Sequence, residues 1–184
     1  ETHITCNRSS NEQRYLGLIE NAKDIIYTHD LSGNYRSANK AAERLTGYSL
    51  EEILNLNARQ VVAPEDLELS MEMLRRKLDS QQGTSYEIEM LTKSGKRIPV
   101  EVNSHLIYNA GVPVGVQGIA RDISARRSVE NALRNSEERY RELFENANDI
   151  VYVHDLQGRF LSLNKTGERI SGYSREEVLK MNVA

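Results

Sequence analysis

Cysteine is almost absent from this chain of 184 residues, in which Cys6 is the single example. One thiol excludes a disulfide framework and a cysteine-rich metal site within one chain. Tryptophan is missing and phenylalanine occurs 2 times, which leaves few rings to stack on a large aromatic cofactor. No window approaches the roughly 18 apolar residues that a membrane-spanning helix needs.

The chain also lacks a strong excess of either charge, because the formal net charge is −3 and the pI is about 5.9. This balance does not predict the basic surface of a nucleic-acid-binding protein. A hydrophobic content of 39% and a charged content of 28% are typical of folded water-soluble domains. We therefore expect a cytoplasmic chain without a membrane segment. Because it starts at Glu1, we interpret it as a fragment whose parent protein is free to carry a membrane anchor elsewhere.

The strongest internal pattern is a repeat, in which Glu20 returns as Glu145 and Gly47 as Gly172. About half of the aligned positions are identical, which indicates one structural unit used twice. One period has the length of a usual domain, and the second stops partway. We therefore expect a leader over residues 1–10 and a complete domain over 11–124. A connecting helix over 125–147 follows, and it overlaps the start of the N-terminal half of a second domain, which spans 137–184.

Periodicity predicts an α+β fold for one repeat. The order is a helix that ends near Ala22, a hairpin, short helices, a longer helix after Pro64 and three antiparallel strands joined by short turns. The longer helix is expected to be buried along its apolar stripe, which comprises Leu67, Met71, Leu74 and Leu78.

Four separated motifs resemble the PAS sensor family, including the closing PAC-type segment. They are residues 29–33, 39–43, 47–52 and 115–124. The resemblance implies a five-stranded antiparallel sheet flanked by short helices, which enclose a small-molecule pocket or a plain apolar core, and a last strand that feeds a signalling helix. Tandem copies of this kind are similar to the sensory regions of bacterial two-component histidine kinases, which start a phosphorelay, and less often of cyclic-dinucleotide enzymes.

Several residues are candidates for a ligand pocket, and each has a simpler structural interpretation. Gln117 stands where flavin-binding relatives carry a ring-bonding glutamine, but it is also an ordinary polar strand residue. Asn39 is a candidate ligand contact or a helix cap. Hydroxyl groups or a pliable apolar lining are expected from the remaining candidates, for which a purely structural role is the simpler interpretation: Tyr27, Tyr48, Met71, Leu74 and Met90.

Two cofactor chemistries are disfavoured by the residues present. The long helix over residues 63–80 contains no histidine, so haem held as in haem-binding relatives is not expected. A covalent flavin needs a cysteine in the central helices, whereas Cys6 precedes the domain. The cofactor, if any, stays unknown. No phosphate-binding loop, nucleophile with its base, kinase-type phosphoacceptor box or metal cluster is recognisable, so we expect no enzyme and no metal site in this chain.

The segment after residue 124 contains neither Gly nor Pro up to Ala147, which predicts a helix. Its apolar seam alternates every three and four residues and favours a parallel homodimer, although packing against its own sheet is an equal alternative. The seam residues are Val129, Leu133, Tyr140 and Leu143. Signal coupling is expected at Asp122, Ile123 and Ser124, where the sheet meets this helix.

The function that follows is a sensory and dimerisation module of a sensor histidine kinase, with a small molecule in the first pocket. The output domain is expected in the missing part of the parent chain. Two alternatives remain open: a structural spacer without a ligand, and a redox sensor with noncovalent flavin.

Overall fold

The computed structural model describes residues 13, 14 and 16–182, and it divides into two units that meet between Ala125 and Arg126. The expected leader over residues 1–10 and Cys6 lie outside the described residues. Residues 16–20 are helical. Each unit has its own sheet, of five strands in the first unit and two in the second.

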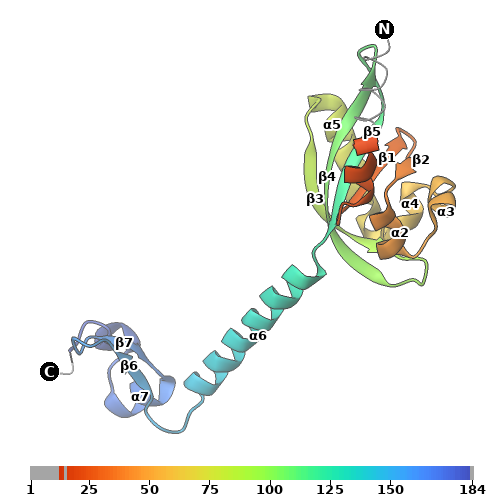
Figure 1. The fold of residues 1–184 in the computed structure, drawn as a ribbon. Helices are drawn as coiled ribbons and strands as arrows, with labels where there is room; N and C mark the ends of the chain where they lie inside the picture. The colour runs from red at the N-terminus through yellow and green to blue at the C-terminus, as the bar shows by residue number, and fades with distance from the viewer. Residues whose placement is uncertain (1–12, 15, 183–184) are drawn as a thin grey trace. The chain divides into compact units, whose positions relative to one another are not determined.

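The sheet of the first unit is antiparallel with the order β2-β1-β5-β4-β3, which confirms the expected five-stranded PAS fold. Because β1 pairs with β5, segments far apart in the sequence lie side by side (Figure 1). The strands are β1 (Ile25–Asp30), β2 (Tyr35–Ala38), β3 (Thr84–Leu91), β4 (Arg97–Asn109) and β5 (Val112–Asp122).

One cross-strand row of this sheet positions the site described below. Tyr27 pairs with Gly118, which pairs with Ser104, which in turn pairs with Thr84. Alternation along β4 sends Val100, Val102 and Ser104 to the same face, and all three are buried. The inner face of the sheet therefore carries a polar residue, Ser104, next to the apolar residues of the core.

Four helices and a 3-10 turn lie between β2 and β3, and Figure 1 shows three of the helices, α2, α3 and α4, gathered beside β1 and β2. A capping box of Ser49 and Glu52 starts α3, as the sequence spacing predicts. A second capping box, of Asn57 and Gln60, starts α4, a helix that we did not expect from the sequence. The elements are α2 (Lys40–Thr46), α3 (Leu50–Leu54), α4 (Ala58–Val61), η1 (Pro64–Asp66) and α5 (Leu67–Ser80).

Helix α5 packs on β3 and β4, but its buried side differs from the expected one. Its buried residues are Met73 and Lys77, whereas Met71 and Leu78 are each 38% exposed. The prediction of a buried apolar stripe on this helix is therefore wrong. The physical reason is that the stripe borders a cavity, described below, instead of filling the core.

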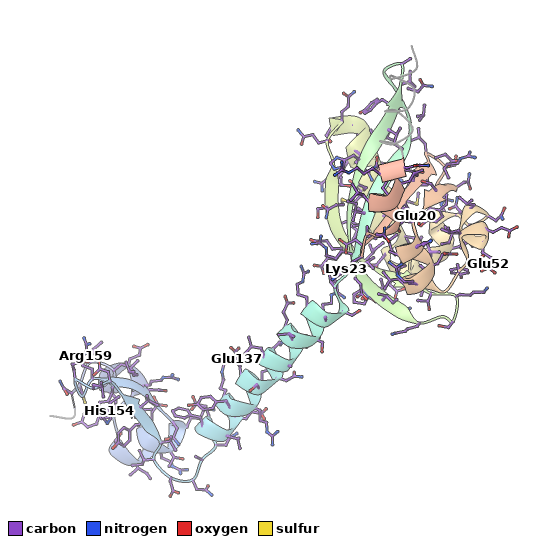
Figure 2. All side chains as sticks on the ribbon, viewed as in Figure 1. Glu20, Lys23, Glu52, Glu137, His154 and Arg159 are labelled. Atoms are coloured by element: carbon purple, nitrogen blue, oxygen red, sulfur yellow. The ribbon has the colours of Figure 1, made fainter. Side chains whose placement is uncertain are left out.

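The second unit repeats the local structure of the first. Asp155 accepts from the backbone amides of Gln157 and Arg159 as Asp30 accepts from those of Ser32 and Asn34. Arg159 is labelled on this hairpin in Figure 2 and also forms an ion pair with Asp155. The elements are α6 (Ser124–Glu145), which spans the unit boundary, and β6 (Tyr152–His154), β7 (Phe160–Leu163), α7 (Lys165–Ser171) and α8 (Arg175–Val178).

Candidate functional site

A cavity of about 80 Å³ lies inside the first unit, between the sheet and helices α2 to α5. Most of its walls are apolar, from Ile53 on α3 to Ile25 on β1 and Val100 on β4. Polar groups reach it from four tyrosines, Tyr27, Tyr35, Tyr48 and Tyr86, and from His29. A concave, mostly apolar space with a few convergent polar groups is the usual form of a small-molecule site.

Strand alternation places three of these rings together. Tyr27 and His29 are two residues apart on β1, so both point to the inner face, and their rings stack with centroids 5.8 Å apart. Tyr35 on β2 meets the ring of Tyr27 edge-on, also at 5.8 Å. Gly118 leaves room for this arrangement, because a Cβ there would lie 2.4 Å from Cζ and Oη of Tyr27. The hydroxyl of Tyr27 thus lies above the middle of the sheet.

Burial raises the pKa of Tyr27, Tyr35 and Tyr86, with desolvation as the largest cause in each case. These hydroxyls therefore remain neutral near pH 7 and can both donate and accept hydrogen bonds. Among the described residues, the structure gives the hydroxyls of Tyr27 and Tyr35 no hydrogen-bond partner. Both tyrosines are half-buried and line the cavity, so their hydroxyls can bond a polar ligand atom or an ordered water there.

A second cavity of about 190 Å³ adjoins the first along α5, and we call it the α5 groove. Its wall is shared with the first cavity at His29, Ala58, Val62, Ser70 and Tyr86. The apolar stripe of α5 that was expected to be buried lines this groove instead, and its residues are Leu67, Met71, Leu74 and Leu78.

Lys77 is the least expected residue of the groove. Its side chain is buried, with the residue only 3% exposed, and Nζ donates to Oγ of Ser104 at 2.7 Å. Burial lowers the pKa of Lys77 to about 8, and burial likewise lowers the pKa of His29. Within residues 13, 14 and 16–182, no Asp or Glu lines either cavity. Sequence reasoning could not find this site, because Lys77 stands among charged residues on a side of the helix that the apolar pattern assigns to solvent.

The structure brings five of the seven predicted pocket residues to these two cavities. Tyr27, Tyr48 and Met90 line the first cavity, and Met71 and Leu74 line the α5 groove. Missed by the sequence reasoning were His29, Tyr35 and Tyr86 besides Lys77. The three ring residues share the inward alternation of Tyr27, a signal that was available in the sequence.

Asn39 and Gln117 line neither cavity, contrary to expectation. Asn39 is fully buried and its amide accepts from the backbone of Ile26 and donates to the backbone of Asp24. It stands at the N-cap position of α2, yet its side chain makes no capping bond. Gln117 is exposed between buried Val116 and Gly118, so β-strand alternation turns it to the outer face.

The predicted coupling residues lie where β5 leads into α6. Oδ1 of Asp122 accepts from the backbone amide of Ser124 at 2.8 Å and so satisfies a free amide at the start of α6. Ile123 is buried, and its backbone amide donates to the carbonyl of Pro99 on β4. The nearby bases form ion pairs with other carboxylates, Arg121 with Asp24 and Arg97 with Glu65.

The four predicted seam residues of α6 are all exposed, between 61% and 70%. Phe144, in contrast, is buried and stacks on the ring of Tyr140 with centroids 6.0 Å apart. Among the described helices, none combines the length and apolar character needed to cross a bilayer. Over residues 13, 14 and 16–182, no three His, Cys, Asp or Glu side chains gather as a metal site would require.

Comparison with known proteins gives consistent matches. Sporulation kinase E of Bacillus subtilis is 30% identical over 172 residues, which cover 88% of this chain and 21% of that protein. A methyl sulfide methyltransferase-associated sensor of Methanosarcina acetivorans is 26% identical over 171 residues, which cover 92% of this chain and 16% of the sensor. The chain therefore spans only about a fifth of these relatives or less.

Solved structures agree with these sequence matches. A PAS domain from Colwellia psychrerythraea superposes with a TM-score of 0.58 at 30% identity, covering 62% of this chain and 97% of that domain. A domain of a sensory box histidine kinase/response regulator from Geobacter sulfurreducens gives 0.52 at 27% identity, covering 61% of this chain and 94% of that domain. The PAS fold family matches residues 13–123 and 138–184. The chain belongs to the PAS family.

Proposed function

We propose that this chain is the sensory and dimerisation part of a two-component sensor histidine kinase, and that its first unit binds a small molecule. The cavity with the unpartnered hydroxyls of Tyr27 and Tyr35 carries this proposal. The similarity to sporulation kinase E and to a sensory box kinase supports the kinase parent. Phosphotransfer itself belongs to the parent outside these residues, since the PAS domain is a non-catalytic sensory module.

The cavity walls and the output helix share a strand. Val116, Gly118 and Ala120 face inward on β5, and β5 ends at Asp122, two residues before the first residue of α6. A ligand that binds one arrangement of the sheet more tightly shifts the population of that arrangement. The strand end moves with the sheet, and the bonds of Asp122 and Ile123 pass the change to α6.

Dimerisation is proposed through α6 because its apolar seam is exposed in the described part of the chain. Val129 and Leu133 lie four residues apart, and Tyr140 and Leu143 lie three apart, as two-helix packing requires. In a dimer, a small rotation or shift of α6 reaches both copies of the output domain together. The expected organisation is thus one ligand site per chain and one shared helical readout.

The size of the cavity favours a small ligand over flavin. Its volume of about 80 Å³ lies well below the roughly 300–1,000 Å³ of sites that hold drug-sized molecules. A three-ring flavin does not fit this space, and Gln117 faces away from it. The residues present therefore do not fit the flavin alternative.

The second unit suggests how to fill the cavity without unfolding the domain. Ala38 and Ala42 of the first cavity correspond to Leu163 and Gly167, which line an equivalent apolar pocket in the second unit. A Cβ on Gly167 would lie 2.3 Å from Cδ1 of Leu163, so the Leu163 side chain fits because residue 167 is a glycine. The double variant Ala38→Leu/Ala42→Gly transfers this natural combination and adds a net two carbon atoms to the cavity wall.

The experiment measures autophosphorylation of the full-length parent carrying this double variant, with Ala42→Gly alone as the matched control. A sensor predicts that filling the cavity fixes the output at one level, whereas the control still responds to growth conditions. Unchanged, normally regulated output in the double variant would instead identify the first unit as a structural spacer. Circular dichroism of the isolated chain checks that both variants fold.

A further inference from the structure

The buried ammonium of Lys77 has no acidic partner among the residues that the structure describes. It lies on α5 against β4, and the structure gives it one acceptor, Oγ of Ser104, although an ammonium has three donors. Buried charges are normally paired, because removing an ion from water costs several kcal/mol. A lysine held this way without a carboxylate is an incomplete ion pair.

The other charged and titratable groups at the groove do not complete it. His29 lies on β1, Arg59 on α4, and Arg75 on α5, so three separate elements contribute basic residues. Arg75 is paired with exposed Glu72 at 3.7 Å, but Glu72 does not line the groove. The phenol of Tyr86 stays neutral because burial raises its pKa. The groove is therefore electrostatically complementary to an anion.

Beside this charge lies the apolar stripe of α5. Leu74 and Leu78 are one helical turn apart and flank Lys77, and Leu67 and Met71 extend the same surface. A stripe of this kind normally packs into a core, yet Met71 and Leu78 retain 38% of their exposure. The groove thus offers an apolar wall next to one buried cation.

We propose that the α5 groove binds a small monocarboxylate with a short apolar tail, whose carboxylate accepts a hydrogen bond from Nζ of Lys77 and whose tail lies along Leu74 and Leu78. This inference rests on the proposed sensory function and names its ligand class. The groove volume of about 190 Å³ compares with the roughly 150 Å³ that hold a benzene molecule in an engineered apolar cavity, so an acid of about five carbons fits. The shared wall at Tyr86 places the acid beside the first cavity.

The test titrates the whole chain at pH 7 with pentanoate and with its neutral isostere pentanamide, by calorimetry. A charge-assisted hydrogen bond in a desolvated site predicts that the acid binds about tenfold more tightly or better. Lys77→Met is expected to remove this preference and leave the affinity for the amide unchanged. Arg76→Met, one residue away and exposed, is the matched control and is expected to keep the preference.

A second measurement follows Lys77 itself. The ¹³Cε resonance of Lys77, titrated with and without pentanoate, is expected to report a rise of its pKa above the value of about 8 in the empty groove. Equal affinity for acid and amide, binding of neither, or an unchanged pKa would overturn the ligand class. A parent protein that still loses regulation in the Ala38→Leu/Ala42→Gly variant would show that the sensory function survives that failure.

Discussion

Replacing Lys77 by methionine should stabilise the ligand-free protein at pH 7. The lysine pKa falls from 10.5 to about 8 on folding, which corresponds to roughly 3 kcal/mol of unfavourable burial of the charge. Partial hydration in the groove reduces this to about 2 kcal/mol. Methionine has a similar length and no charge, but it gives up the bond to Ser104, worth about 1 kcal/mol. The free energy of unfolding should therefore rise by about 1 kcal/mol.

The pH dependence gives the sharper signature. Below pH 8 both the folded and the unfolded chain hold the Lys77 proton, so the cost of the buried charge is fully present. Between pH 8 and 10.5 the unfolded chain binds more protons, so the stability of the wild type rises with pH. The advantage of Lys77→Met should consequently shrink across this interval and disappear by about pH 10.

Urea denaturation between pH 7 and 10, in a buffer free of carboxylates, measures this difference. Other titrating groups, including the buried tyrosines, cancel when wild type and variant are compared at the same pH. Lys96→Met, at an exposed position in the turn between β3 and β4, serves as the control and should show no pH-dependent difference. A Lys77→Met protein that is less stable at pH 7, by an amount independent of pH, would refute the reasoning.

Three further predictions concern packing, coupling and assembly. Gly118→Ala should cost about 1–3 kcal/mol in urea denaturation, because its Cβ would meet the ring of Tyr27 at 2.4 Å; an unchanged midpoint would mean that the ring moves freely. Asp122→Ala should lower the free energy of unfolding by about 1 kcal/mol, because the first amide of α6 loses its acceptor. If the junction carries the signal, the same variant of the parent protein should also lose regulation. Leu133→Glu should shift a dimer to monomer in sedimentation velocity, whereas Asn135→Glu, off the seam, should not; a wild type that is monomeric at all concentrations contradicts the proposed dimer.

Strong local patterns made most of the fold predictable from the sequence. The alternation over Tyr86–Met90 and the capping box of Ser49 and Glu52 each fix a structure within a few residues, and both were predicted. That all five strands form one sheet came only from the family resemblance, and the pairing of β1 with β5, which joins segments about 90 residues apart, was not predicted. Helix α4 has a four-residue signal with a polar cap and no periodicity, which is too short to detect.

The site was less predictable because it depends on which side of an element faces the core. On α5 the apolar stripe indicated burial, whereas the packed side contains Lys77 and the stripe borders a cavity. On β5 the glycines at 115 and 118 remove the apolar alternation that would have shown Gln117 to face outward. A lysine buried without an acidic partner leaves no signal in the sequence, because its hydrogen-bond partner is Ser104 on a distant strand.

Native mass spectrometry of the chain as purified, before and after mild denaturation, tests the central claim most directly. The account predicts a small extra mass that leaves on unfolding, that is lost in the Lys77→Met variant, and that corresponds to an organic acid. The parallel spectrum of the control variant Arg76→Met should retain it. A chain that carries no extra mass, and that shows no stabilisation by small carboxylates added at millimolar concentration, would contradict a ligand-binding sensor and leave a structural PAS spacer.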